Sequence, residues 1–175
     1  MATIFTHPIV PIVAGMLAGK ERVSKRLLVG ASLASIIPDA DVIAFRFGIS
    51  YASEFGHRGF THSIIFAAVL GLITMGFSGY FQAKRRVVFL MMFIGALSHP
   101  FLDAFTNGGL GVAAFWPFDT ARYFWPYTPI EVSPIGAGFF SARGLDVILS
   151  ELMLVWLPAA IILLLSKYLM TSIKK

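Results

Sequence analysis

The sequence predicts an all-α protein, a multi-pass transmembrane bundle of about five helices. Of its 175 residues, 57% are hydrophobic and only 13% are charged, which is about half of the charged share of a typical soluble domain. The apolar residues also gather in five runs with short polar breaks between them. Because backbone groups in lipid must be hydrogen-bonded internally, these runs are expected to be helices.

The five runs differ in how well they suit a membrane span, which needs about 20 mostly apolar residues. The first, residues 4–19, is short and contains two prolines, so it is a marginal span. The second, residues 27–47, is interrupted by Pro-Asp-Ala-Asp but is long enough. The remaining three suit a span well in length and composition: residues 60–81, 87–105 and 147–165.

We expect the whole chain, residues 1–175, to form one integral-membrane domain. Its longest connection, residues 107–146, is rich in glycine and aromatic side chains and is predicted to be an extracytoplasmic loop. Tryptophan and tyrosine are enriched at membrane interfaces. The aromatic side chains of residues 115–140 are therefore interpreted as an interfacial belt, with a lid or a lipid-entry rim over a site as the alternative.

The distribution of basic residues predicts how the bundle is oriented. All of them lie at alternate connections, in residues 20–26, 84–86 and 167–175, except Arg46, Arg58, Arg122 and Arg143. Lysine and arginine mark cytoplasmic loops, so the N-terminus is predicted outside the plasma membrane and the C-terminus in the cytoplasm. All four histidines, and every acidic residue except Glu21, then fall toward the outer face.

Composition also limits the partners and the chemistry. The net charge is +5, but the basic residues form short clusters between apolar runs and not one continuous face. Nucleic acid is therefore not expected as a partner, whereas membrane lipids are. The chain has no cysteine, which excludes disulfides and thiolate metal ligands. Nothing in the sequence specifies an oligomeric state.

Three motifs gather ionisable side chains toward the predicted outer face: PDAD at 38–41, HRGFTH at 57–62 and SHPFLDAFTNGG at 98–109. His99 and Asp103 are four residues apart and so share one face of a helix. Pro100 predicts a kink or a helix restart beside them. Thr61 is expected to cap the third apolar helix, with His62 in its first turn.

These motifs predict a site for one or two divalent metal ions. Histidine nitrogens with carboxylate oxygens suit zinc first, and manganese or iron as alternatives. Ionisable groups inside a span cost about 2.5 to 3.5 kcal/mol each, so packing alone explains such a cluster poorly. A structural network of hydrogen-bonded polar groups is the alternative. The predicted ligands are His57, His62, His99, Asp103, Asp41, Asp39 and His7.

Four residues are candidates for catalysis: Asp39, Asp41, Glu54 and Arg58. A water activated by the metal would attack the substrate, and one of the three carboxylates would take its proton. Arg58 would bind a substrate phosphate, or else pair with Glu54, Asp39 or a lipid headgroup. The site's depth in the membrane favours a lipid or another phosphoester as substrate.

The order of these motifs resembles the LexA-regulated, inner-membrane metal-dependent hydrolase family of bacteria. The resemblance covers residue 1 to about residue 165, and its most specific part is HRGFTHS at 57–63. It implies a multi-pass inner-membrane protein with a metal-dependent hydrolase activity. The other residues that carry it are His7, Asp39, Asp41, His99, Asp103, Thr106 and Gly109.

The alternative to an enzyme is a non-enzymatic membrane protein with a structural or transported metal ion. A transporter needs polar residues through both halves of the membrane. The inner halves of the predicted spans are almost wholly apolar, which disfavours transport. A structural ion would use the same ligands as a catalytic one, so that alternative stays open.

Overall fold

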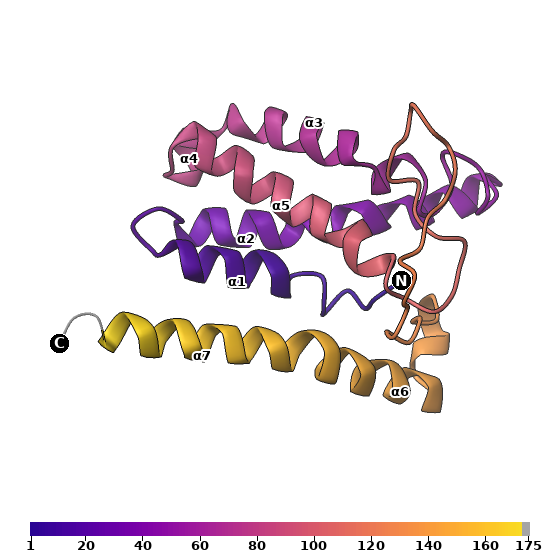
Figure 1. Ribbon diagram of the computed structural model, residues 1–175. Coiled ribbons are helices and arrows are strands. Elements are labelled where there is room, and N and C mark those ends of the chain that lie inside the picture. The colour runs from indigo at the N-terminus through magenta and orange to yellow at the C-terminus, as the bar shows by residue number, and fades with distance from the viewer. Residues whose placement is uncertain (173–175) are drawn as a thin grey trace.

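A computed structural model describes residues 1–172 of the protein (Figure 1). Lys174 and Lys175, part of the predicted cytoplasmic cluster, lie outside the described residues. The fold is all-α, as predicted. Its α-helices are α1 (Ile9–Ala18), α2 (Lys25–Ala34), α3 (Ile64–Met75), α4 (Ser78–Phe81), α5 (Arg85–Asp103), α6 (Ala142–Glu151) and α7 (Leu157–Ser172). The 3₁₀ helices are η1 (Ile37–Phe47), η2 (Phe60–His62) and η3 (Gly136–Phe139), and a π-helix, η4 (Leu152–Trp156), joins α6 to α7.

Within residues 1–172, three helical segments are long and apolar enough to cross a membrane. They are Lys25–Phe47, Arg85–Asp103 and Ala142–Ser172, which correspond to the second, fourth and fifth predicted runs. The first and third runs form shorter apolar helices, α1 with 10 residues and α3 with 12. At 1.5 Å per residue, neither helix alone reaches across the hydrocarbon core.

The third run is shorter than expected because its ends are not α-helical. Ser63 is the N-cap of α3, and its hydroxyl accepts a hydrogen bond from the amide of Phe66 at 3.0 Å. The prediction that Thr61 is the cap, with His62 in the first turn, is therefore wrong. Both residues lie in η2, just before the cap. At the other end, the chain turns after Met75 before α4 begins.

α5 is the central helix of the bundle. It contacts α1, α2 and α3, while α7 lies beside α1 at the edge (Figure 1). It runs as one helix through Pro100, so the predicted restart does not occur. The hydrophobic core forms mainly between α2 and α5 and comprises Val23, Leu27, Ala31, Ala34, Phe81, Val88, Met91 and Met92. Within its range Leu157–Ser172, α7 has no buried residue, which suits a helix surrounded by lipid.

The two ends of the bundle carry different chemistry. The α1–α2 connection and the α3–α5 connection lie at one end, opposite the N-terminus and the long loop (Figure 1). These connections carry the basic clusters at 20–26 and 84–86, and Arg26 hydrogen-bonds the carbonyl oxygen of Tyr80. The three ionisable motifs lie at the opposite end.

Replacing Gly95 with Ala is expected to destabilise the bundle. A Cβ at Gly95 would lie 2.4 Å from the carbonyl oxygen of Ala31, so α2 and α5 would have to separate. Such overpacking costs about 1–3 kcal/mol, measurable as a lower thermal unfolding midpoint in detergent micelles. The matched control is Gly79→Ala, whose Cβ meets nothing within 4 Å. Equal midpoints for the two variants would contradict this reading of the α2–α5 contact.

Candidate metal centre

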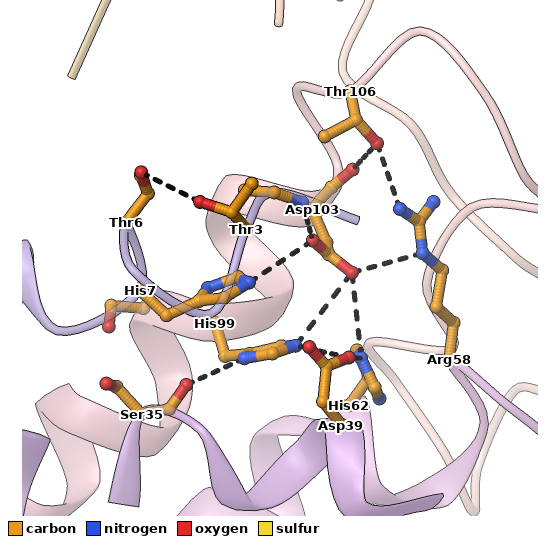
Figure 2. A network of polar contacts seen from close by, with 12 residues as sticks. Thr3, Thr6, His7, Ser35, Asp39, Arg58, His62, His99, Asp103 and Thr106 are labelled. Atoms are coloured by element: carbon orange, nitrogen blue, oxygen red, sulfur yellow. Dashed lines mark hydrogen bonds and ion pairs between the residues drawn. The ribbon is translucent and has the colours of Figure 1, made fainter. Parts of the chain in front are cut away.

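The predicted ligands lie together at one end of the bundle, and all are buried. They come from four segments: the turn before α1, η1, residues 57–62 and the C-terminal end of α5. Figure 2 shows His62, His99, Asp39 and Asp103 pointing toward one another. Segments separated by as many as 96 residues of a largely apolar chain thus meet at one polar cluster.

The first ligand group is formed by Asp39, His62, His99 and Asp103, whose four contributing atoms lie within 4.8 Å of one another. His99 Nε2 lies 3.2 Å from Asp39 Oδ1. His62 Nε2 lies 3.8 Å from that oxygen and 3.7 Å from Asp103 Oδ2. Ligands held at about 2.0–2.2 Å from a tetrahedral zinc ion are themselves about 3.4 Å apart, so the spacing suits such an ion.

Polar atoms in this group have no hydrogen-bond partner among residues 1–172. They are both carboxylate oxygens of Asp39, Nε2 of His62, Nε2 of His99 and Oδ2 of Asp103, of which the last has an ion pair with Arg58. A buried polar atom without a partner costs about 1–3 kcal/mol. One cation in contact with these atoms would compensate most of that cost at once, so the donor set fits a divalent metal.

The second ring nitrogen of each of these histidines contacts a protein oxygen. His99 Nδ1 lies 2.7 Å from the carbonyl oxygen of Ser35 and therefore donates to it, which leaves Nε2 with a free lone pair. His62 Nδ1 lies 3.2 Å from Asp41 Oδ2. Such contacts fix the tautomer and ring orientation that a metal requires.

A second possible ligand group consists of Asp41, His57 and His62. Asp41 Oδ1 lies 2.7 Å from His57 Nδ1, and Oδ2 accepts hydrogen bonds from the Arg58 amide at 3.1 Å and the Thr61 hydroxyl at 2.7 Å. Both carboxylate oxygens of Asp41 thus hydrogen-bond to residues 57–62 and hold that segment in place. The two aspartates of PDAD are both buried but differ in their nearest neighbours: Asp39 lies nearest to His99 of α5, and Asp41 lies nearest to residues 57–62.

Arg58 is fully buried beside the first ligand group. Its Nε lies 3.1 Å from Asp103 Oδ2, while Nη1 and Nη2 donate to the Gly108 carbonyl and the Thr106 hydroxyl at 3.0 and 2.9 Å. Its ion-pair partner is therefore Asp103. The sequence had suggested Glu54, Asp39 or a lipid headgroup instead. The planar, five-donor guanidinium suits such a fixed set of acceptors.

Gly109 has a steric reason to be glycine. Its φ is +87°, and a Cβ there would lie 2.6 Å from the Tyr51 hydroxyl and 3.0 Å from Arg58 Nη1. Only glycine adopts this backbone conformation without strain. Tyr51 closes the cluster on this side, and burial raises the pKa of its hydroxyl.

His7 and Glu54 differ in their relation to the cluster. The His7 ring stacks on His99 with centroids 3.6 Å apart, and its Nε2 lies 3.7 Å from Asp103 Oδ1. His7 thus borders the first group without belonging to it. Glu54 is exposed and accepts a hydrogen bond from the Trp116 indole at 3.1 Å, so the structure does not bring it to the ligands.

Sequence reasoning missed the residues that hold the N-terminal segment against the cluster. Glu151 is buried, and its carboxylate accepts hydrogen bonds from the amide and hydroxyl of Thr3 and from the hydroxyl of Thr6. The amide of Ala2 then donates to Asp103 Oδ1 at 2.8 Å. The available signal was a lone carboxylate inside the fifth apolar run.

A buried cluster of histidines and aspartates at one end of an apolar helical bundle defines an integral membrane protein with a candidate metal centre. The chain belongs to the YdjM inner membrane protein family, which matches residues 1–174. The family name agrees with the predicted location in the inner membrane. Membership in this family does not by itself include the hydrolase activity that the motif resemblance implies.

Two relatives extend the comparison. The chain is 40% identical over 166 residues to the inner membrane protein YbcI of Escherichia coli (strain K12), which covers 93% of this chain and 95% of that protein. It is 39% identical over 85 residues to the uncharacterized protein YvsG of Bacillus subtilis (strain 168), covering 47% and 50% of the two chains. No solved structure matches the chain significantly.

Proposed function

We propose that the protein is a membrane-embedded, metal-dependent hydrolase with its active site at the extracytoplasmic face. The observation that carries the proposal is the convergence of buried nitrogen and oxygen atoms from Asp39, His62, His99 and Asp103. None of these atoms has a hydrogen-bond partner in residues 1–172, although Asp103 Oδ2 is ion-paired with Arg58. A purely structural polar network would be expected to satisfy its own buried atoms.

The proposed topology has all five apolar runs crossing or entering the membrane, with the N-terminus outside and the C-terminus in the cytoplasm. It is supported by the basic connections at 20–26 and 84–86, which lie at one end of the bundle (Figure 1). Positive charge favours the cytoplasmic side. The metal centre, at the other end, would then face outward.

The first ligand group would hold the metal, with zinc favoured by its two nitrogens and two carboxylate oxygens. A bound divalent ion supplies Lewis acidity, which lowers the pKa of a water and stabilises negative charge on a phosphoryl or acyl oxygen. Manganese or iron would accept the same donors. His57 and Asp41 would support these ligands, and His7 would pack against His99.

The chain's own side chains would then handle the proton and the charge. The second carboxylate oxygen of Asp39 is buried without a partner and would take the proton from the attacking water. The water oxygen bonds to phosphorus or carbon, the bond to the leaving oxygen breaks, and that oxygen receives the proton. Arg58, paired with Asp103, adds positive charge beside the developing negative charge.

The experiment is a hydrolysis assay on protein purified in mild detergent without chelator. Vesicles of phosphatidylglycerol, phosphatidylethanolamine and phosphatidic acid, and the soluble ester p-nitrophenyl phosphate, are tested for release of headgroup, phosphate or fatty acid. Release should be lost when a chelator removes the metal and should return when zinc or manganese is added back. His62→Ala should lower it by more than the roughly 10–100-fold effect of losing a supporting contact.

The control variant is Arg46→Ala, which changes an exposed residue and should leave turnover unchanged. A protein that binds metal stoichiometrically but hydrolyses none of these esters would contradict the hydrolase. It would favour the alternative, a non-enzymatic membrane protein with a structural ion.

A further inference from the structure

An apolar cavity of about 510 Å³ lies directly beside the metal centre, with His62 in its wall. Helix α5 and the first residue of α3 form one side, and the long aromatic loop forms the other. The remaining lining residues are Ile64, Leu97, Pro100, Phe101, Ala104, Val112, Ala114, Phe115, Tyr123, Phe124, Trp125 and Pro126.

The wall of this cavity is almost wholly apolar, because the polar groups of its tyrosine and tryptophan side chains are already hydrogen-bonded. The Tyr123 hydroxyl donates a hydrogen bond to Asp119, and the Trp125 indole donates to the carbonyl oxygen of Phe101 at 3.3 Å. Both polar groups thus already have hydrogen-bond partners within the protein. Among the lining side chains, His62 alone carries a buried polar atom, Nε2, without a hydrogen-bond partner in residues 1–172.

The loop that forms the outer wall is attached to the segment that carries the ligands. The amide of Ile64 donates to the Ala114 carbonyl, and the amide of Ala113 donates to the Arg58 carbonyl, both at 3.0 Å. Val112 and Tyr123 exchange two backbone hydrogen bonds of 2.9 Å. Residues 58–64 therefore fix the position of the cavity wall relative to the metal centre.

From this arrangement we propose that the cavity binds a hydrocarbon chain of a lipid substrate and places the adjoining ester at the metal centre. The inference rests on the proposed hydrolase and specifies its substrate class. The volume lies within the roughly 300–1,000 Å³ of small-molecule pockets. A nucleotide or sugar phosphate would leave its polar groups without partners in this wall, whereas an acyl chain needs none.

A second apolar cavity, of about 520 Å³, supplies an internal control. It lies between α1, α5 and α7 and contains no histidine or acidic residue in its lining, which includes Ala14, Phe105 and Ala159. Any detergent or lipid tail could fill this space nonspecifically. Occupancy there would say nothing about a substrate.

The test uses palmitic acid with a photoreactive diazirine at mid-chain, cross-linked to the full-length protein in micelles and mapped by mass spectrometry. We expect labelling of Phe115, Phe124 and Trp125, which line this cavity and not the second one, and we expect excess unlabelled palmitate to displace it. Ala104→Trp should reduce it at least about fivefold, because the new side chain would occupy the cavity. Ala159→Trp, in the control cavity, should not.

Metal content, measured on the same samples, reports whether each variant still folds around its centre. If Ala104→Trp does not retain metal, Phe115→Ser replaces it, since Phe115 is exposed and lies on the loop side. Labelling that neither variant reduces, or that unlabelled palmitate does not displace, would overturn the proposal. Metal-dependent turnover of p-nitrophenyl phosphate without labelling of the cavity would overturn the lipid substrate and keep the hydrolase. Cavity labelling in a protein that binds no metal would overturn the hydrolase.

Discussion

His99→Ala protein is expected to lose the metal of the first ligand group, from about one equivalent per chain to less than about a tenth, because losing one of the four ligands should cost more affinity than the roughly 10–100-fold effect of losing a supporting contact. His99 Nε2 is the ligand atom nearest to Asp39, and Ser35 holds its ring in position. The alanine side chain leaves no donor in its place. Elemental analysis of protein purified gently without chelator measures the loss.

Two further variants show whether the effect belongs to one group or to both. Asp41→Asn keeps the shape of the side chain but weakens its support of His57 and His62, so metal affinity should fall by about 10–100-fold. His57→Ala removes a ligand of the second group alone. If that group holds its own ion, His57→Ala and His99→Ala should each lose one of two equivalents.

A full equivalent of metal in His99→Ala would contradict the assignment of the first group. The same result in all three variants would mean that the metal binds elsewhere. The cluster would then be a polar contact between helices, and the proposed hydrolase would lose its main support.

Local sequence patterns predicted those parts of the fold that depend on neighbouring residues. The apolar runs became helices because backbone groups in lipid must pair within the segment. The four-residue spacing of His99 and Asp103 placed both on one face of α5, and the histidine motifs converged with them. The length of α3 was missed because neither the Ser63 cap, two residues after Thr61, nor the turn after Met75 was recognised.

Contacts between distant segments could not be read from local spacing. The sequence shows that Asp39 and Asp41 diverge, but which one faces α5 depends on packing around η1. The partner of Arg58 lies 45 residues away in Asp103, and Glu151 reaches back 148 residues to Thr3. A charged residue in an apolar run predicts that a partner exists, but the local sequence does not identify that partner.

Arg58→Met is expected to destabilise the folded protein by about 3–5 kcal/mol, the usual cost of removing one partner of a buried ion pair. Arg58 and Asp103 are both fully buried, with Nε and Oδ2 3.1 Å apart. Methionine fills much of the space but leaves the buried Asp103 carboxylate without its guanidinium partner. It also removes the donors that Gly108 and Thr106 accept from.

The measurement is the unfolding midpoint in detergent micelles at fixed metal concentration, since an ion bound only to the folded protein would itself raise stability. The matched control is Arg143→Met, in the 2.8 Å pair with Glu131, where the two side chains are 47% and 33% exposed. An exposed pair contributes only about 0.2–1 kcal/mol, so this variant should change the midpoint little. Arg58→Lys should be intermediate, because lysine keeps the charge but lacks the planar fork that reaches three acceptors at once. Equal shifts for Arg58→Met and Arg143→Met would mean that solvent reaches Asp103, and a water-accessible carboxylate would remove the electrostatic case for a metal in the first ligand group.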